Sequence, residues 1–275
     1  MTWRNLHAEE LEVQFNPRRA VPDFEAYQAA NAARSAEIRA RLEARLDLAY
    51  GDGPLQTLDV FPAAAAAGGG AAPVHVFFHG GYWRAQDKAN FAFVAEHLVA
   101  QGICTVVANY DLCPAVTLDG VVAAARRAIA WTFAHAGEFG ADPARLTLSG
   151  SSAGAHLQAM ALAHDWPGEG LPADLIKGAV PITGIYDPEP ARHVSVNAET
   201  PVMSCPVTYW VRSTMCAPIS PRAPDPALSR WSRHTSGNCG STIQSCRYTA
   251  RTWRIVPSRP AATSWRRYAT AGTRR

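Results

Sequence analysis

The sequence lacks the long apolar run that a membrane-spanning helix needs. No stretch of about 18 consecutive apolar residues occurs in the 275-residue chain, so we expect no transmembrane helix. Residues 1–12 carry Glu9, Glu10 and Glu12 and have no apolar centre, so we do not expect a secretory signal there. A chain of this length suits one large domain with a full hydrophobic core.

Cysteine is scarce, and its spacing is not that of a metal site. The six cysteines form no CxxC pair and no Cys/His pattern of the kind that binds zinc. Cys104 and Cys113 are expected to be reduced packing residues of a cytoplasmic protein.

Residues 200–275 lack lysine and glutamate and contain one aspartate, Asp225. Residues 1–199 carry 14 basic and 22 acidic side chains, a net charge of −8, whereas residues 200–275 carry 12 arginines and one aspartate, a net charge of +11; together they give the +3 of the whole chain. Such an asymmetry is typical of a basic tail that binds nucleic acid or a membrane.

Apolar strand patterns alternate with amphipathic helix patterns along most of the chain. We expect helices over residues 21–45, 90–101, 118–139 and 155–164, and strands over residues 55–61, 74–78, 104–109, 146–149 and 176–182. The strand over residues 55–61 alternates as a half-exposed strand does. The order predicts an α/β fold, with a mainly parallel sheet and helices on both faces.

A pentapeptide of the form G-x-S-x-G lies at residues 150–154, between a predicted strand and a predicted helix. This is the setting of a nucleophile elbow, a strained turn that raises the hydroxyl of its central serine clear of the sheet. We expect Ser152 to attack an acyl carbon, and the N–H of Ala153 to stabilise the oxyanion that forms. A helix N-terminus merely capped by serine is the alternative.

A second glycine-rich loop, HGGYW at residues 79–83, follows the strand over residues 74–78. Backbone N–H groups of Gly80 and Gly81 can point into a cleft, and each donor to an oxyanion contributes about 3–4 kcal/mol. Tyr82 and Trp83 either line an aromatic substrate pocket or pack the loop. The carboxyl ends of parallel strands meet at one edge, so we expect this loop beside Ser152.

Four further titratable residues lie near these motifs, and we expect none of them to be the acid or the base. His79 is expected to orient the loop, and His156 to have a structural role on its helix. Asp187 is interpreted as a loop or pocket-wall residue. His193 is interpreted as a surface histidine, and its alternative role is to compensate for a missing base.

The motifs HGGYW, NYDLCP (109–114), LSGSSAGAHL (148–157) and GIYD (184–187) resemble, in identity and order, those of the α/β-hydrolase fold. Within that fold, residues 20–199 are similar to the group that contains kynurenine formamidase (arylformamidase) and HGG-type carboxylesterases.

This resemblance implies that Ser152 is the nucleophile and that Gly80, Gly81 and Ala153 form the oxyanion hole. The implied reaction is the hydrolysis of N-formylkynurenine to kynurenine and formate, a step of tryptophan catabolism, or of small esters. The implied partner is a small acyl or formamide substrate, and neither a metal nor an organic cofactor is needed.

In the family's chain order, the acid and the base follow the nucleophile, beyond residue 200. Only Asp225 and His234 have suitable side chains there. They are weak candidates, because they stand close together in sequence and neither follows a convincing strand.

Residues 200–275 carry four tryptophans, four cysteines and ten serines without the periodicity of a strand or a helix. We therefore assign residues 1–199 to the hydrolase core, with its N-terminal helix and its sheet through the strand near residues 176–182. Residues 200–275 are expected to be irregular or poorly folded, and we hypothesise that they arise from out-of-frame translation of a GC-rich gene. The hypothesis predicts weak or absent activity.

Two functions of other classes compete with a hydrolase. One is a non-catalytic binding protein of the same fold, and the other is an arginine-rich arm that binds nucleic acid. The second is disfavoured because residues 200–275 contain no nucleic-acid-binding motif. We expect neither nucleic acid nor a membrane as a partner. The oligomeric state is left open, with a homodimer as one option.

Overall fold

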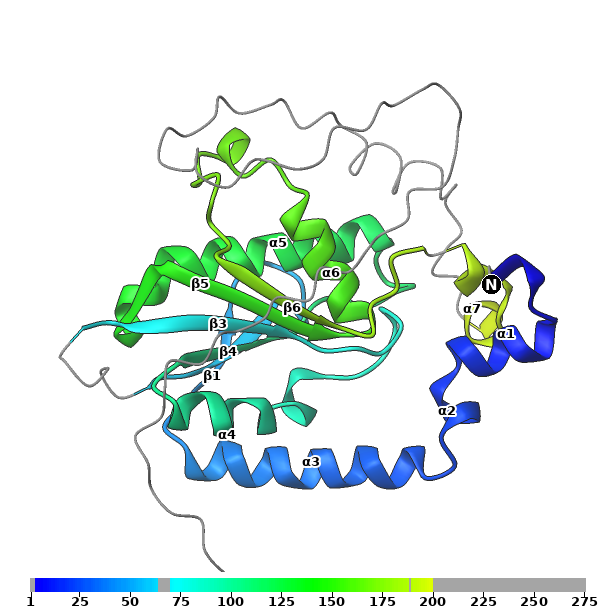
Figure 1. Cartoon of the computed structure of the whole chain (residues 1–275). Helices are drawn as coiled ribbons and strands as arrows, with labels where there is room; N and C mark the ends of the chain where they lie inside the picture. The colour runs from blue at the N-terminus through cyan, green and yellow to red at the C-terminus, as the bar shows by residue number, and fades with distance from the viewer. Residues whose placement is uncertain (1–2, 64–69, 188, 200–275) are drawn as a thin grey trace, which may run out of the picture. The chain divides into compact units, whose positions relative to one another are not determined.

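The computed structural model describes residues 3–63, 70–187 and 189–199. Within these residues, six strands form one sheet in the order β1-β2-β4-β3-β5-β6 (Figure 1). The strands are β1 (Arg45–Ala49), β2 (Thr57–Phe61), β3 (Ala72–Phe78), β4 (Cys104–Ala108), β5 (Ala141–Ser151) and β6 (Gly178–Ile182). Strands β3 to β6 pair in parallel, whereas β1 and β2 are antiparallel to their neighbours. The predicted α/β fold with a mainly parallel sheet is confirmed.

Helices cover both faces of the sheet, as predicted (Figure 1). On one face, α5 (Leu118–His135) and α6 (Ala153–Leu162) pack against β5. On the other face, α4 (Phe93–Ala100) packs against β4, and the long helix α3 (Phe24–Arg41) packs on α4. Helix α5 presents an apolar stripe to the sheet, with Val121, Ala125 and Ile129 almost fully buried.

Short helices complete the described structure. They are α1 (Ala8–Phe15), α2 (Pro17–Ala20), α7 (Ser195–Glu199) and the 3₁₀ turns η1 (Trp3–Asn5), η2 (Lys88–Asn90), η3 (Ala136–Phe139), η4 (Pro167–Glu169) and η5 (Pro190–His193). The carboxylate of Glu12 in α1 accepts hydrogen bonds from the N–H and the hydroxyl of Ser195, at 2.8 and 2.5 Å. These bonds lower the pKa of Glu12 and join α1 to α7.

The predicted helix over residues 21–45 is too long at its carboxyl end. Helix α3 ends at Arg41, and Arg45 begins the edge strand β1. Asp47 within β1 has a φ of 57°, and its N–H donates to the Asp59 carboxylate of β2 at 2.9 Å. A contact across the sheet therefore decides the conformation here, and the local sequence pattern does not reveal it.

The prediction that the strand over residues 55–61 is half exposed was wrong. In β2, every residue from Leu58 to Phe61 is buried, including Asp59 with 0% exposure. The charged position that looked solvent-facing is buried because its carboxylate forms ion pairs with Lys88 and Arg39, at 2.8 and 3.3 Å.

Cys104 and Cys113 are buried free thiols in the hydrophobic core, as predicted for packing residues. Burial raises the pKa of both thiols. No helix in the described part of the chain combines the length and apolarity needed to cross a membrane. The predicted irregular segment, residues 200–275, lies outside the described residues.

Candidate active site

Ser152 stands at a sharp turn between the end of β5 and the start of α6. Its backbone has φ 53° and ψ −112°, a conformation that costs a residue with a side chain about 1–3 kcal/mol. The N–H of Ser152 donates to the carbonyl of Ile182 at the end of β6, at 2.8 Å. The residue is partly exposed. Strand, strained turn and helix thus place a partly exposed serine at the carboxyl edge of the sheet.

Two glycines flank this turn because β3 passes close to it. A Cβ added to Gly154 would lie 2.1 Å from the carbonyl oxygen of Phe78, and one added to Gly150 would lie 2.8 Å from the same atom. Only glycine lets helix α6 approach the end of β3 this closely. The approach brings Ser152 to the loop that follows β3.

The loop after β3 packs against the serine turn. A Cβ on Gly80 would lie 3.4 Å from the Cβ of Ser152 and 3.1 Å from the carbonyl oxygen of Ser151. The chain then takes positive φ values at three successive residues, Gly81, Tyr82 and Trp83. The two predicted motifs, far apart in sequence, therefore meet at one edge of the sheet.

His79 is fully buried beneath this loop. Its Nδ1 lies 2.7 Å from the carbonyl oxygen of Gly80, and its Nε2 lies 2.9 Å from the Oδ1 of Asn109. The ring stacks on Tyr110 with 4.3 Å between ring centroids, and the hydroxyl of Tyr110 donates to the carbonyl of His79 at 2.8 Å. Burial lowers the pKa of His79. These contacts fit the predicted role of orienting the loop.

Tyr82 and Trp83 are buried, with exposed fractions of 8% and 0%. The Tyr82 hydroxyl donates to the carbonyl of Ala191 at 2.5 Å, and the Trp83 ring meets the edge of His156 at 5.1 Å between centroids. Burial favours the second of the two predicted roles, in which both side chains pack the loop.

The remaining titratable candidates occupy separate surroundings. His156 is buried, and burial lowers its pKa to about 4, so the imidazole is neutral at pH 7. His193 is exposed and lies 3.3 Å from the Glu189 carboxylate. The exposed Asp187 accepts a hydrogen bond from the N–H of Glu189 at 3.1 Å. The other candidates for acid and base, Asp225 and His234, lie outside the described residues.

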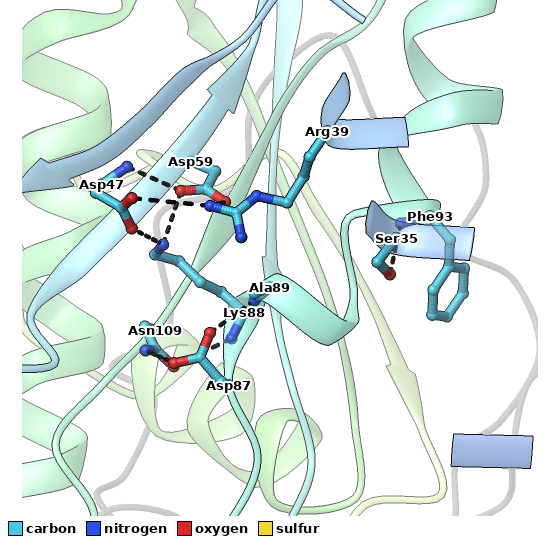
Figure 2. A network of polar contacts seen from close by, with 9 residues as sticks. All are labelled: Ser35, Arg39, Asp47, Asp59, Asp87, Lys88, Ala89, Phe93 and Asn109. Carbon is cyan, nitrogen blue, oxygen red and sulfur yellow. Dashed lines mark hydrogen bonds and ion pairs between the residues drawn. The ribbon is translucent and has the colours of Figure 1, made fainter. Parts of the chain in front are cut away.

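Sequence patterns did not single out an ion cluster next to the loop, in which Lys88 and Asp59 are buried, Arg39 is half-buried and Asp47 is exposed. Figure 2 shows its members, Arg39, Asp47, Asp59 and Lys88, together with Asp87 and Asn109. A hydrogen bond from Lys88 lowers the pKa of Asp47. One signal existed in the sequence: the chain has 26 basic residues, but only Lys88 and Lys177 are lysines. Within the described residues, no group of three or more His, Cys, Asp or Glu side chains is placed to hold a metal ion.

Comparison with known families gives a match over residues 75–248 to the family described as having the alpha/beta hydrolase fold. The matched region extends beyond residue 199, so it includes part of the arginine-rich segment.

Among curated proteins, the chain is 32% identical over 201 residues to kynurenine formamidase of Danio rerio, covering 71% of this chain and 66% of that protein. It is 33% identical over 202 residues to kynurenine formamidase of Salmo salar, with the same coverage. The esterase LipQ of Mycobacterium tuberculosis is 34% identical over 148 residues, covering 51% of this chain and 35% of the esterase. The chain thus spans about 66% of the length of the two formamidases.

Solved structures show the same fold. A protein from Silicibacter sp. TM1040, provisionally assigned as a thioesterase, superposes with a TM-score of 0.58 at 31% identity, covering 69% of each chain. Inhibited esterase B from Lactobacillus rhamnosis superposes with a TM-score of 0.50 at 21% identity, covering 65% of this chain and 62% of that one.

Proposed function

The chain belongs to the α/β-hydrolase fold family, and from this premise we propose that it descends from, and retains the half-site of, a serine hydrolase of small acyl substrates. In this proposal Ser152 attacks the acyl carbon. The observation that carries it is the contact between two independent motifs: the strained, partly exposed Ser152 lies directly against Gly80 of the glycine loop. A serine that merely capped a helix would need neither the strain nor the second loop.

The oxyanion that forms at the attacked carbonyl needs N–H donors, and we propose Ala153, Gly80 and Gly81 for this role. The first N–H groups of a helix have no carbonyl partner within that helix, and Ala153 opens α6. The positive end of the helix dipole favours negative charge at the same point. The glycines add no side chain that would separate their N–H groups from substrate.

The proposed substrate class is the aryl formamide, with N-formylkynurenine as its representative and release of formate. Two formamidases support this choice, since each matches 71% of the chain, against 51% for the esterase LipQ. Small carboxylic esters are the second candidate, because the esterase match is equally high in identity.

We propose that the catalytic acid and base follow the nucleophile in the chain. Asp225 and His234 are the candidates by chain order, and both lie outside the described residues. His156 does not fit as a base, because it is buried and its pKa is lowered to about 4. A hydrolase without its base retains about 10³–10⁴-fold acceleration over water, and we expect turnover of this weak order here.

Turnover of p-nitrophenyl acetate and of N-formylkynurenine, in wild type and Ser152→Ala, tests the proposal. We expect slow hydrolysis, with N-formylkynurenine preferred, that Ser152→Ala leaves within about tenfold, because without a base the remaining acceleration comes from the oxyanion hole and substrate binding. Turnover at ordinary enzyme rates that persists in Ser152→Ala would contradict the nucleophile. Turnover at ordinary enzyme rates that also disappears in His234→Ala would instead show a working Asp225/His234 pair.

A fluorophosphonate probe separates a hydrolase from a binding protein of the same fold. Only an activated serine reacts quickly with such a probe. Labelling that is no faster than that of free serine, together with no turnover, would favour the non-catalytic protein. Binding to duplex DNA that weakens steeply with salt would favour the nucleic-acid-binding arm.

A further inference from the structure

We propose that Lys88 is a positioning residue of this site: its buried ammonium group anchors the chain segment that holds the glycine loop against Ser152. The proposal rests on the proposed function, and it extends the site to a residue outside the two motifs. Lys88 opens the 3₁₀ turn η2, which follows the loop in sequence.

The ammonium group of Lys88 is held in one place by two carboxylates (Figure 2). Lys88 is 2% exposed, and its Nζ lies 2.8 Å from the Oδ1 of Asp59 and also contacts the Oδ1 of Asp47. An ammonium group removed from water is costly unless it is paired and hydrogen-bonded. The Lys88 side chain therefore has one favourable position, at these carboxylates.

The carboxylate of Asp59 is a rigid anchor point. Asp59 lies within β2 and pairs in register with Val107 of β4. Its Oδ1 also accepts the N–H of Asp47, at 2.9 Å, and its Oδ2 lies 3.3 Å from Arg39 of α3. The anchor is thus part of the sheet and is braced by a helix, whereas η2 is a short turn.

The backbone and the neighbour of Lys88 fix the side-chain amide of Asn109. The N–H of Lys88 lies 3.3 Å from the Oδ1 of Asn109, and the Nδ2 of Asn109 donates to the Asp87 carboxylate at 2.7 Å (Figure 2). The amide oxygen of Asn109 faces a donor, the Lys88 N–H, and its amide nitrogen faces an acceptor, the Asp87 carboxylate. Only one orientation of the amide satisfies both contacts. That orientation depends on where η2 sits.

Asn109 connects the turn η2 to the glycine loop through His79. Its Oδ1 lies 2.9 Å from the Nε2 of His79, whose Nδ1 lies 2.7 Å from the carbonyl oxygen of Gly80. Gly80 in turn packs against Ser152. A neutral imidazole has one N–H, so His79 donates to one of these two oxygens, and its ring is also held by stacking on Tyr110, whose hydroxyl donates to the His79 carbonyl. Buried polar and packing contacts therefore link Lys88 to Gly80, which lies against Ser152.

Arg39 provides a matched control, because it shares the carboxylate of Asp59 but lies on α3. Its ion pairs are with Asp59 and Asp47, at 3.3 and 3.8 Å. Loss of either cation weakens the neutralisation of the same buried carboxylate. Only the loss of Lys88 removes the link between that carboxylate and the turn η2.

The experiment compares wild type, Lys88→Met and Arg39→Gln. Deuterium exchange of the backbone amides over residues 79–86 reports how firmly the loop is held, and the ester kcat and KM report catalysis. We expect Lys88→Met to speed exchange in this loop and to lower kcat about 10- to 100-fold with little change in KM, because small displacements of catalytic groups cost this much. We expect Arg39→Gln to lower thermal stability while leaving loop exchange and kcat unchanged.

Deuterium exchange over residues 79–86 tests the positioning role of Lys88 even if the wild type proves inactive. Unchanged exchange in Lys88→Met, or equal acceleration in both variants, overturns the proposal. So does accelerated exchange with unchanged kcat in an active enzyme. Accelerated exchange in Lys88→Met alone, with a wild type that shows no turnover, supports the anchor and contradicts the proposed function.

Lys88→Met risks failing to fold, because it leaves Asp59 with less neutralisation. Asp47→Asn is the second variant, since the Asp47 side chain is 67% exposed and its loss weakens the hold on Lys88 without leaving a buried charge. We expect a smaller acceleration of exchange over residues 79–86. Unchanged exchange in a folded Asp47→Asn protein, when Lys88→Met cannot be obtained, counts against the proposal.

Discussion

Gly80 packs directly against Ser152, so that a Cβ on the glycine would lie 3.4 Å from the Cβ of the serine. The loop after β3 and the turn after β5 are therefore in contact. Parallel pairing of β3 with β5, which sets Phe78 opposite Gly150, is what places the two strand ends together.

Gly80→Ala tests how much the rate of catalysis depends on this contact. The added Cβ would lie 3.1 Å from the carbonyl oxygen of Ser151, so the loop must move by a few tenths of an ångström. We expect kcat on a small ester to fall by about 10- to 100-fold while KM changes little, because the N–H donors move relative to the nucleophile. Steady-state kinetics measure this, and an unchanged kcat would show that the loop has no role in catalysis.

Gly154→Ala is expected to destabilise the fold itself. The added methyl would lie 2.1 Å from the carbonyl oxygen of Phe78, a backbone atom that cannot move aside without shifting β3 or α6. Overpacking of this kind costs about 1–3 kcal/mol or more in unfolding free energy. Urea unfolding measures the loss.

Gly137→Ala is the matched control for that substitution. A Cβ at Gly137 meets no atom within 4 Å, and the residue lies in the 3₁₀ turn η3. The same chemical change should leave the unfolding free energy within about 1 kcal/mol of wild type, or raise it slightly. A similar loss in both variants would mean that the contact with Phe78 is not the cause.

Most of the fold was predictable because the central strands and the helices follow simple periodicities. Strand β4, for example, is a continuous apolar run, and it begins at Cys104 as expected. Strand β1 was not predictable in this way. Its residues, RLDLA, look like the continuation of a charged helix, and they form a strand because Leu48 and Ala49 pair with Leu58 and Thr57 of β2.

The candidate site likewise contains residues that the sequence predicts and residues that it does not. Ser152 and Gly80 belong to local motifs, and the backbone alone explains why those residue types occur there. Lys88 and Asp59 belong to no motif, since an ion pair between distant residues leaves no periodic trace in the sequence. The burial of Trp83 likewise depends on packing against His156, which local sequence cannot show.

His75 is expected to make stability depend on pH. Its ring nitrogens lie 2.8 Å from the Thr147 hydroxyl and 2.6 Å from the Ser149 hydroxyl, contacts that a neutral imidazole satisfies by donating once and accepting once. Burial lowers the pKa of His75 to about 4. An unfolded histidine titrates near 6.5, so on acidification the unfolded chain binds a proton before the folded one does.

The contribution of His75 is therefore fully present above about pH 6.5 and is lost as the pH falls toward 4. Between pH 7 and pH 4.5 the loss is on the order of 2–3 kcal/mol in unfolding free energy. Urea unfolding at several pH values in this range measures it. We expect His75→Gln to have a flatter pH profile than wild type, and an equally steep profile would contradict the assignment.

Strand β6 ends the sheet within the described residues, and it exposes Val180 and Ile182 by 61% and 47%. Apolar side chains on an edge strand favour aggregation unless another element covers them. We therefore expect one of the two other reading frames, from about codon 199, to encode further strands with an aspartate and then a histidine. A chain restored in that frame should be more soluble and should hydrolyse esters about 10³-fold faster or more, since it regains a base. If neither frame encodes such a segment, or if the restored chain is no more active than this one, residues 200–275 are not the product of a frame change.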